Sequence, residues 1–123
     1  MKRIAVIFAG GVGARMNNSK TPKQFLEWNG RPILIQTLDV FEQTDSIDGI
    51  VLVCKAEWID HTKNLIKDAG LQKIVSIVPG GDSALDSQYN GLTEAKRLFP
   101  NEEVTVLIHD GVRPLVDLSL IHI

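Results

Sequence analysis

The sequence predicts an α/β protein with a doubly wound, mostly parallel sheet, and two observations predict it. Four apolar runs rich in Val and Ile lack a clear alternation with polar residues, which is typical of strands buried on both faces of a parallel sheet. Segments with apolar residues at helical spacing lie between them, so the expected order is β-α-β-α-β-α-β. With 123 residues, of which 44% are hydrophobic, the chain can bury one core, and we expect a single domain over residues 1–123.

Strand and turn signals divide the chain regularly. The four predicted strands are Ile4–Phe8, Ile50–Cys54, Ile74–Val78 and Val104–Ile108. The Asn29-Gly30 pair predicts a turn in the connection that follows the first strand. Such a sheet has right-handed crossovers, and ligands bind beyond the carboxyl ends of its parallel strands, where the winding reverses. The loops that follow the strands are therefore the candidate site.

Three helices are expected between the strands. Their apolar positions are Leu34, Leu38 and Phe41 in the first, Ile59, Thr62, Ile66 and Ala69 in the second, and Leu85, Tyr89, Leu92, Ala95 and Phe99 in the third. Pro32 stands where the first helix would begin, and Pro100 stops the third. Gly70 follows the second helix where a glycine commonly ends it.

The segment after the first strand has the composition of a phosphate-binding loop. Its three closely spaced glycines are Gly10, Gly11 and Gly13. Glycines let backbone N–H groups approach an anion without a Cβ in the way. Arg15 and Lys23 add positive charge, and Pro22 stiffens the chain beside Lys23.

Two common nucleotide motifs fit this segment poorly. A dinucleotide-binding G-x-G-x-x-G motif beginning at Gly11 would need glycine where Met16 stands, so an NAD-dependent oxidoreductase is the weaker alternative. A Walker motif needs a glycine before its Lys-[Ser/Thr] pair, whereas Ser19 precedes Lys20-Thr21. A non-catalytic nucleotide-binding domain is the other alternative.

The composition limits the kinds of molecule that the chain is expected to bind. Lys and Arg number 13 against 15 Asp and Glu, giving a net charge of −2, so nucleic acid and anionic membranes are poor candidates and a small anion is favoured. The single Cys54 cannot form an intramolecular disulfide. The apolar run that stops at Gly10 is too short for a signal peptide or a membrane span. We therefore expect a cytoplasmic protein.

Three segments together resemble the sugar-phosphate nucleotidyltransferases, and within them the cytidylyltransferases for 2-C-methyl-D-erythritol 4-phosphate and D-ribitol 5-phosphate. They are residues 9–25, which end in Pro22-Lys23-Gln24-Phe25, then Gly80-Gly81-Asp82 with Ser87, and His109-Asp110-Gly111-Val112-Arg113-Pro114, which is similar to the family's H-D-x-x-R-P motif. The resemblance covers nearly all of residues 2–117. It implies a Rossmann-like nucleotidyltransferase fold and an enzyme that transfers CMP from CTP to a polyol phosphate, releasing pyrophosphate.

The resemblance also implies a role for each matching residue. The triphosphate would be surrounded by Ala9, Gly10, Gly11 and Gly13. The catalytic residues would be Arg15 and Lys23, with Lys23 facing the α-phosphate. The cytosine and its ribose would contact Gly81, Asp82 and Ser87. Asp110 would hold Mg²⁺ near the phosphates and, with Arg113, bind the polyol phosphate.

The chain departs from the family pattern in two ways. Family members often carry Arg where this chain has Ser83-Ala84-Leu85. Family chains are also longer, and their remaining part supplies a dimerising arm. We therefore expect the N-terminal part of an enzyme that is a homodimer at full length, truncated on its C-terminal side. The apolar stretch 115–123 indicates either a fragment or a tail of non-native sequence.

Some site residues also fit purely structural roles. Asp82 could be the N-cap of the third helix, Asp110 could cap a turn, and Arg113 could be solvated or ion-paired. These interpretations stay open beside the functional ones.

The sequence leaves the polyol open as well. Phe25 and the pair Gly111-Val112 are more similar to the ribitol-phosphate branch of the family. Gly80-Gly81-Asp82 followed by Asp86-Ser87 is more similar to the methylerythritol branch. Ribitol 5-phosphate and 2-C-methyl-D-erythritol 4-phosphate are therefore both candidate substrates.

Overall fold

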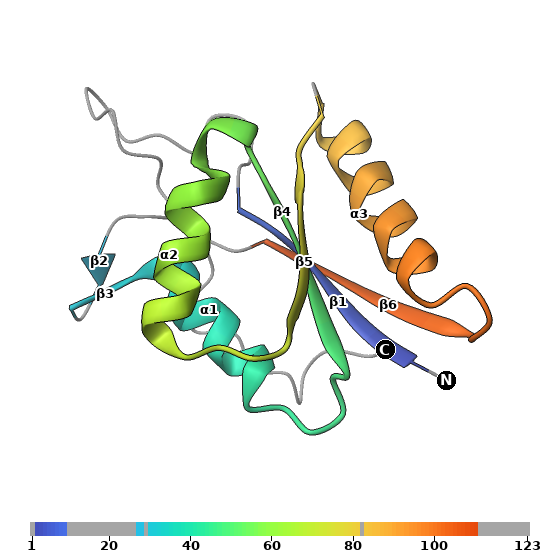
Figure 1. Ribbon diagram of the computed structural model, residues 1–123, viewed down its shortest axis with the longest axis horizontal. Helices are drawn as coiled ribbons and strands as arrows, with labels where there is room; N and C mark the ends of the chain where they lie inside the picture. The colour runs from blue at the N-terminus through green and yellow to red at the C-terminus, as the bar shows by residue number, and fades with distance from the viewer. Residues whose placement is uncertain (1, 10–26, 29, 82, 111–123) are drawn as a thin grey trace.

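A four-stranded parallel sheet forms the centre of the fold (Figure 1). The computed structural model describes residues 2–9, 27–28, 30–81 and 83–110. The strands are β1 (Lys2–Phe8), β4 (Gly49–Cys54), β5 (Ile74–Pro79) and β6 (Val104–Asp110). They lie in the order β5-β4-β1-β6, and each neighbouring pair is parallel. The four predicted strands are confirmed, each slightly longer than predicted.

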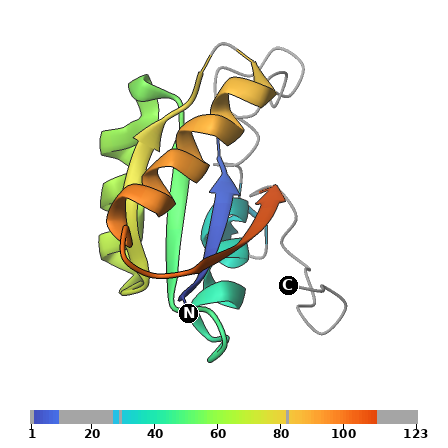
Figure 2. The same cartoon turned by 90° about the vertical axis from the view of Figure 1, so that its right-hand side faces the viewer.

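Helices cover both faces of this sheet, as the doubly wound prediction requires. They are α1 (Ile33–Glu42), α2 (Ile59–Ala69) and α3 (Ala84–Leu98). Helices α1 and α2 lie on one face and α3 lies on the other (Figures 1 and 2). Gly70 ends α2 with a φ of 72°, a left-handed conformation that glycine adopts without strain. Within the described residues, no helix has the length and apolar character needed to cross a bilayer.

Two short features were not predicted. A hairpin of β2 (Glu27–Trp28) and β3 (Arg31–Pro32) precedes α1, and a 3-10 turn, η2 (Ala56–Trp58), precedes α2. Only the turn between β2 and β3 had a signal in the sequence, and Gly30 there has a φ of 81°. Elements of two or three residues are too short to produce a periodic pattern.

Alternate residues of the two central strands belong to different cores. Ile7 of β1 and Leu52 of β4 are fully buried in the core that also contains residues of α1 and α2. Val6 and Val53 are buried on the opposite face with Ala95 of α3. Because both faces are covered, the buried positions 4–7 of β1 and 50–54 of β4 are all apolar, which explains the missing alternation in the sequence.

The third helix packs on the sheet with only part of its predicted apolar stripe. Leu85 is 74% exposed and Tyr89 is 69% exposed, whereas Gly91 and Ala95 are buried against the sheet. The helix was nevertheless predicted correctly, because periodicity reveals a helix regardless of which stripe contacts the sheet.

The N-cap of α3 is Ser83, and the structural alternative for Asp82 is therefore wrong. The side chain of Ser83 accepts a hydrogen bond from the backbone N–H of Asp86 at 3.1 Å. Asp82 is one residue too early for this geometry, since a capping side chain bonds an N–H two or three residues further on.

Candidate functional site

The winding of the sheet reverses between β1 and β6. The chain runs from β1 outward through β4 to β5 and then crosses to β6 on the other side of β1. Phe8, the last residue of β1, pairs with Asp110, the last residue of β6. The stretch that follows β1 and the stretch that follows β6 therefore begin side by side at the point where α/β sheets bind ligands.

Hydrogen bonds bring the start of the β5 loop to the same edge. The N–H of Ala9 donates to the carbonyl oxygen of Val53 at 2.7 Å, and the N–H of Gly80 donates to that of Cys54 at 2.9 Å. The ends of β1 and β5 are thus both anchored to the end of β4. Of the predicted site residues, the structure gathers Ala9, Gly81, Ser87 and the backbone of Asp110 along this edge.

Gly81 and Ser87 are in direct contact. The N–H of Gly81 donates to Oγ of Ser87 at 3.1 Å. A Cβ at position 81 would lie 2.3 Å from Cβ of Asp86, so no other residue fits there without a shift of the loop or of α3. The sequence prediction that these two residues belong to one site agrees with this contact.

Several predicted site residues lie outside the described residues. They are Gly10, Gly11, Gly13, Arg15, Lys23, Asp82 and Arg113. Among the described side chains, no group of three or more His, Cys, Asp and Glu residues is placed to hold a metal ion. The phosphate-binding and metal-binding roles therefore stay predictions.

Cys54 ends β4 at this edge, but its thiol is unsuited to nucleophilic chemistry. Its side chain is fully buried, and Sγ lies 3.5 Å from Oγ1 of Thr62, itself buried. Burial raises the pKa of the Cys54 thiol, because the thiolate would lose its hydration. Cys54 is therefore a packed core residue and not a nucleophile.

Three polar side chains of α3 hold it against β5 and its loop. Besides Ser87, they are Asn90, whose Nδ2 donates to the carbonyl oxygen of Pro79 at 3.1 Å, and Glu94, which accepts a 2.5 Å hydrogen bond from Oγ of Ser76. Asn90 and Glu94 were missed by the sequence analysis, although their spacing of three and seven residues from Ser87 places them on the same helix face.

Glu94 is held in its charged form. Nε of Arg97 donates to its Oε1 at 2.6 Å, and the side chain of Glu94 is only 13% exposed. The hydrogen bonds from Arg97 and from Ser76 lower the pKa of Glu94 to about 2, outweighing the opposing effect of burial.

The stability of the fold should depend on this carboxylate in a pH-dependent way. We expect Glu94→Gln to lower the free energy of unfolding at pH 7 by about 1 kcal/mol, a small value because solvent around the exposed Arg97 screens the pair. Since the folded pKa lies below that of the unfolded chain, the contribution is complete above about pH 4.5 and is lost as the pH falls toward 2. Urea unfolding at pH 7, 4 and 3 checks this. Glu102→Gln, at an exposed position, is the control, and a constant difference at all three pH values would contradict the assignment.

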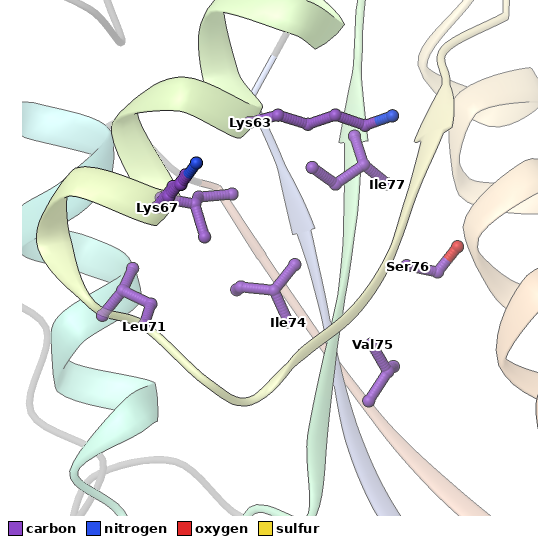
Figure 3. Close-up of a pocket in the computed structure, with 8 residues that line it drawn as sticks. Lys63, Lys67, Leu71, Ile74, Val75, Ser76 and Ile77 are labelled. Atoms are coloured by element: carbon purple, nitrogen blue, oxygen red, sulfur yellow. The ribbon is translucent and has the colours of Figure 1, made fainter.

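A groove of about 300 Å³ lies away from this edge, between α2 and β5 (Figure 3). It is lined by Lys63, Ile66, Lys67, Leu71, Ile74, Val75, Ser76 and Ile77. None of the described residues predicted for the site contributes to it. The groove is therefore separate from the candidate site.

Comparisons with known proteins identify the family of the chain. The family model described as 2-C-methyl-D-erythritol 4-phosphate cytidylyltransferase (IspD) matches residues 3–122. A ribitol-5-phosphate cytidylyltransferase of Streptococcus agalactiae is 47% identical over 122 residues, which are 99% of this chain and 50% of that protein. A 2-C-methyl-D-erythritol 4-phosphate cytidylyltransferase of Lachnospira eligens is 36% identical over 118 residues, covering 96% of this chain and 49% of the relative.

A solved structure has the same fold. The 4-diphosphocytidyl-2C-methyl-D-erythritol synthase of Anaerococcus prevotii superposes with a TM-score of 0.74 at 32% sequence identity, over 97% of this chain and 47% of that one. The chain thus spans about half the length of the curated relatives it matches. The family model extends over nearly the whole chain, and the chain belongs to the 2-C-methyl-D-erythritol 4-phosphate cytidylyltransferase (IspD) family.

Proposed function

We propose that this chain forms the nucleotide-binding part of an enzyme that transfers CMP from CTP to a polyol phosphate. The observation that carries the proposal is the convergence of Ala9, Gly81, Ser87 and the end of β6 at the edge where the winding reverses. The names of the relatives in the same family support the choice of nucleotide and of reaction.

The reaction suits a site that relies on positioning and charge. An oxygen of the polyol phosphate attacks the α-phosphorus of CTP, a new P–O bond forms, and the bond to the β-phosphate breaks as pyrophosphate leaves. The second pKa of a phosphate monoester is about 6, so the attacking group is already largely ionised at pH 7 and needs no general base. The transition state needs N–H donors and positive charge, which the glycines after Ala9 together with Arg15 and Lys23 would supply.

Mg²⁺ is the metal ion that the carboxylate of Asp110, together with the phosphate oxygens of CTP, would fit. Magnesium is usually bound by one or two carboxylates together with substrate phosphates. Asp110 ends β6 directly beside the end of β1, where the glycine segment begins, so its position in the sheet suits such a role. When bound, the ion would neutralise charge on the phosphate oxygens of CTP.

Ribitol 5-phosphate is the acceptor we favour, with 2-C-methyl-D-erythritol 4-phosphate as the second candidate. Relatives named for ribitol 5-phosphate include four at 47% identity and one at 39%, whereas three named for the methylerythritol substrate are 36% to 43% identical. A homodimer of the longer chain stays a prediction.

Calorimetric titration with CTP and Mg²⁺ tests the nucleotide. We expect CTP to bind this chain more tightly than ATP or NAD, because the loop after β5 is expected to recognise the cytidine half of the ligand. Tighter binding of NAD would instead favour the oxidoreductase alternative. A chain of the relatives' length should then release pyrophosphate faster with ribitol 5-phosphate than with the methylerythritol substrate, and the reverse order would overturn the choice of acceptor.

A further inference from the structure

The segment Pro79–Gly81, which leaves β5 and enters the candidate site, is held on two sides. On one side, the N–H of Gly80 donates to the carbonyl oxygen of Cys54 at the end of β4. On the other, α3 supplies Oγ of Ser87 for the N–H of Gly81 and Nδ2 of Asn90 for the carbonyl oxygen of Pro79. The three consecutive residues therefore each have a hydrogen bond to a separate anchor.

Asn90 has a function in this arrangement that no backbone group can replace. Among the described strands, β5 is at the edge of the sheet and pairs only with β4. Pro79, the last residue of β5, has no N–H, so its carbonyl oxygen is the backbone group through which α3 can form a hydrogen bond with this residue. The amide of Asn90 provides that contact from the helix.

The close packing of α3 places Asn90 within reach of the loop. Its neighbour Gly91 is buried, and a Cβ at that position would lie 2.5 Å from Cγ1 of Val6 and 3.0 Å from Cγ2 of Val53. The missing side chain lets the helix backbone lie directly on β1 and β4. A short side chain such as that of Asn90 can then span the distance to Pro79.

We propose that Asn90 is a positioning residue that fixes Pro79–Gly81, and with it Ser87, in the geometry that receives the cytidine half of CTP. This inference rests on the proposed function and goes beyond it by assigning a role to a residue that contacts the loop and not the reacting phosphates. A loop held in its bound shape before the ligand arrives does not lose ordering entropy on binding. Loss of Asn90 should therefore weaken nucleotide binding and reduce base selectivity.

The test compares two variants of Asn90 with matched controls. Asn90→Asp keeps the shape and removes the donor, and Asn90→Ala removes the contact. Asn64→Asp and Asn64→Ala make the same changes at an exposed position on α2, on the other face of the sheet. Calorimetry with CTP, UTP and inorganic pyrophosphate is the readout, with Tm measured for every protein.

We expect both Asn90 variants to bind CTP about five- to twentyfold more weakly and to distinguish CTP from UTP less well. Pyrophosphate, which lacks the cytidine half, should bind unchanged, as should all three ligands in the Asn64 variants. In a chain of the relatives' length, KM for CTP should rise while kcat stays nearly constant, because a ground-state binding contact is lost. A general loss of structure would instead weaken all three ligands equally and lower Tm.

Two failures can be told apart. If the unaltered chain binds CTP and the Asn90 variants bind it equally well, the positioning role is wrong and the proposed function stands. If the unaltered chain binds pyrophosphate but not CTP, the proposed function is wrong and this inference is wrong with it. Faster amide hydrogen exchange at Gly81 in Asn90→Asp, with unchanged exchange at Ala9, would support the mechanism independently of any ligand. Unchanged exchange at Gly81 would overturn it.

Discussion

Replacing Lys23 by alanine is expected to lower kcat at least about a hundredfold in a chain of the relatives' length, because one preorganised positive donor at the reacting phosphate is lost. Lys23 lies outside the described residues, and the role tested here is the one that the resemblance to the cytidylyltransferases implies. Steady-state release of pyrophosphate measures the effect. The KM for CTP should change much less than kcat, because charge at the attacked phosphate is stabilised mainly in the transition state.

The matched control for this experiment is Lys20→Ala. Lys20 lies three residues earlier in the same segment, and neither the motif pattern nor the resemblance gives it a role. Both variants remove one positive charge, so a general electrostatic effect would appear in both. A loss of less than tenfold for Lys23→Ala would refute its assignment as a catalytic residue.

The second large effect is expected at Gly91, where valine should lower the free energy of unfolding by about 2–3 kcal/mol. Already the first added carbon would lie 2.5 Å from Cγ1 of Val6 and 3.0 Å from Cγ2 of Val53, and both partners are buried and β-branched. Neither can rotate away without a clash. Urea unfolding measures the change, with a Tm decrease of about 10 °C as its thermal counterpart.

Two further variants separate packing from helix propensity at this site. Gly91→Ala should be less damaging than valine, because alanine gains about 1 kcal/mol of helix propensity that offsets part of the overpacking. Thr93→Val introduces valine two positions further along α3, where the side chain is exposed, and should be close to neutral. If Gly91→Val were equally neutral, this result would contradict the close packing of α3 against β1 and β4.

The sequence was most informative about elements with strong periodicity. The four apolar runs predicted the strands because both faces of the sheet are covered, and Gly70 and Pro32 correctly indicated helix ends. The strand order was not readable from these patterns. The alternation of strands and helices was enough to predict that the segments after the strands lie at one edge of the sheet, and Ala9, Gly81, Ser87 and the backbone of Asp110 do lie there. Their roles in binding stay predictions.

What the sequence could not provide were contacts that depend on how closely α3 approaches the sheet. Leu85 and Tyr89 of the predicted apolar stripe are exposed, whereas Gly91, which packs directly on the sheet, offers no hydrophobic signal. The hydrogen bond from Asn90 to Pro79 follows from that approach. The residue type alone gave no sign of this contact, since asparagine side chains are mostly exposed to solvent.

The pairing of β1 with β6 has a consequence for how the protein is made. Lys2 lies opposite Val104, so the two strands come from opposite ends of the described chain. During synthesis, β1 and β4 can associate long before β6 has left the ribosome, because β4 is much nearer to β1 in the sequence than β6 is. We therefore expect the ligand-binding edge to be completed last, and the nascent protein to expose one side of β1 until β6 arrives.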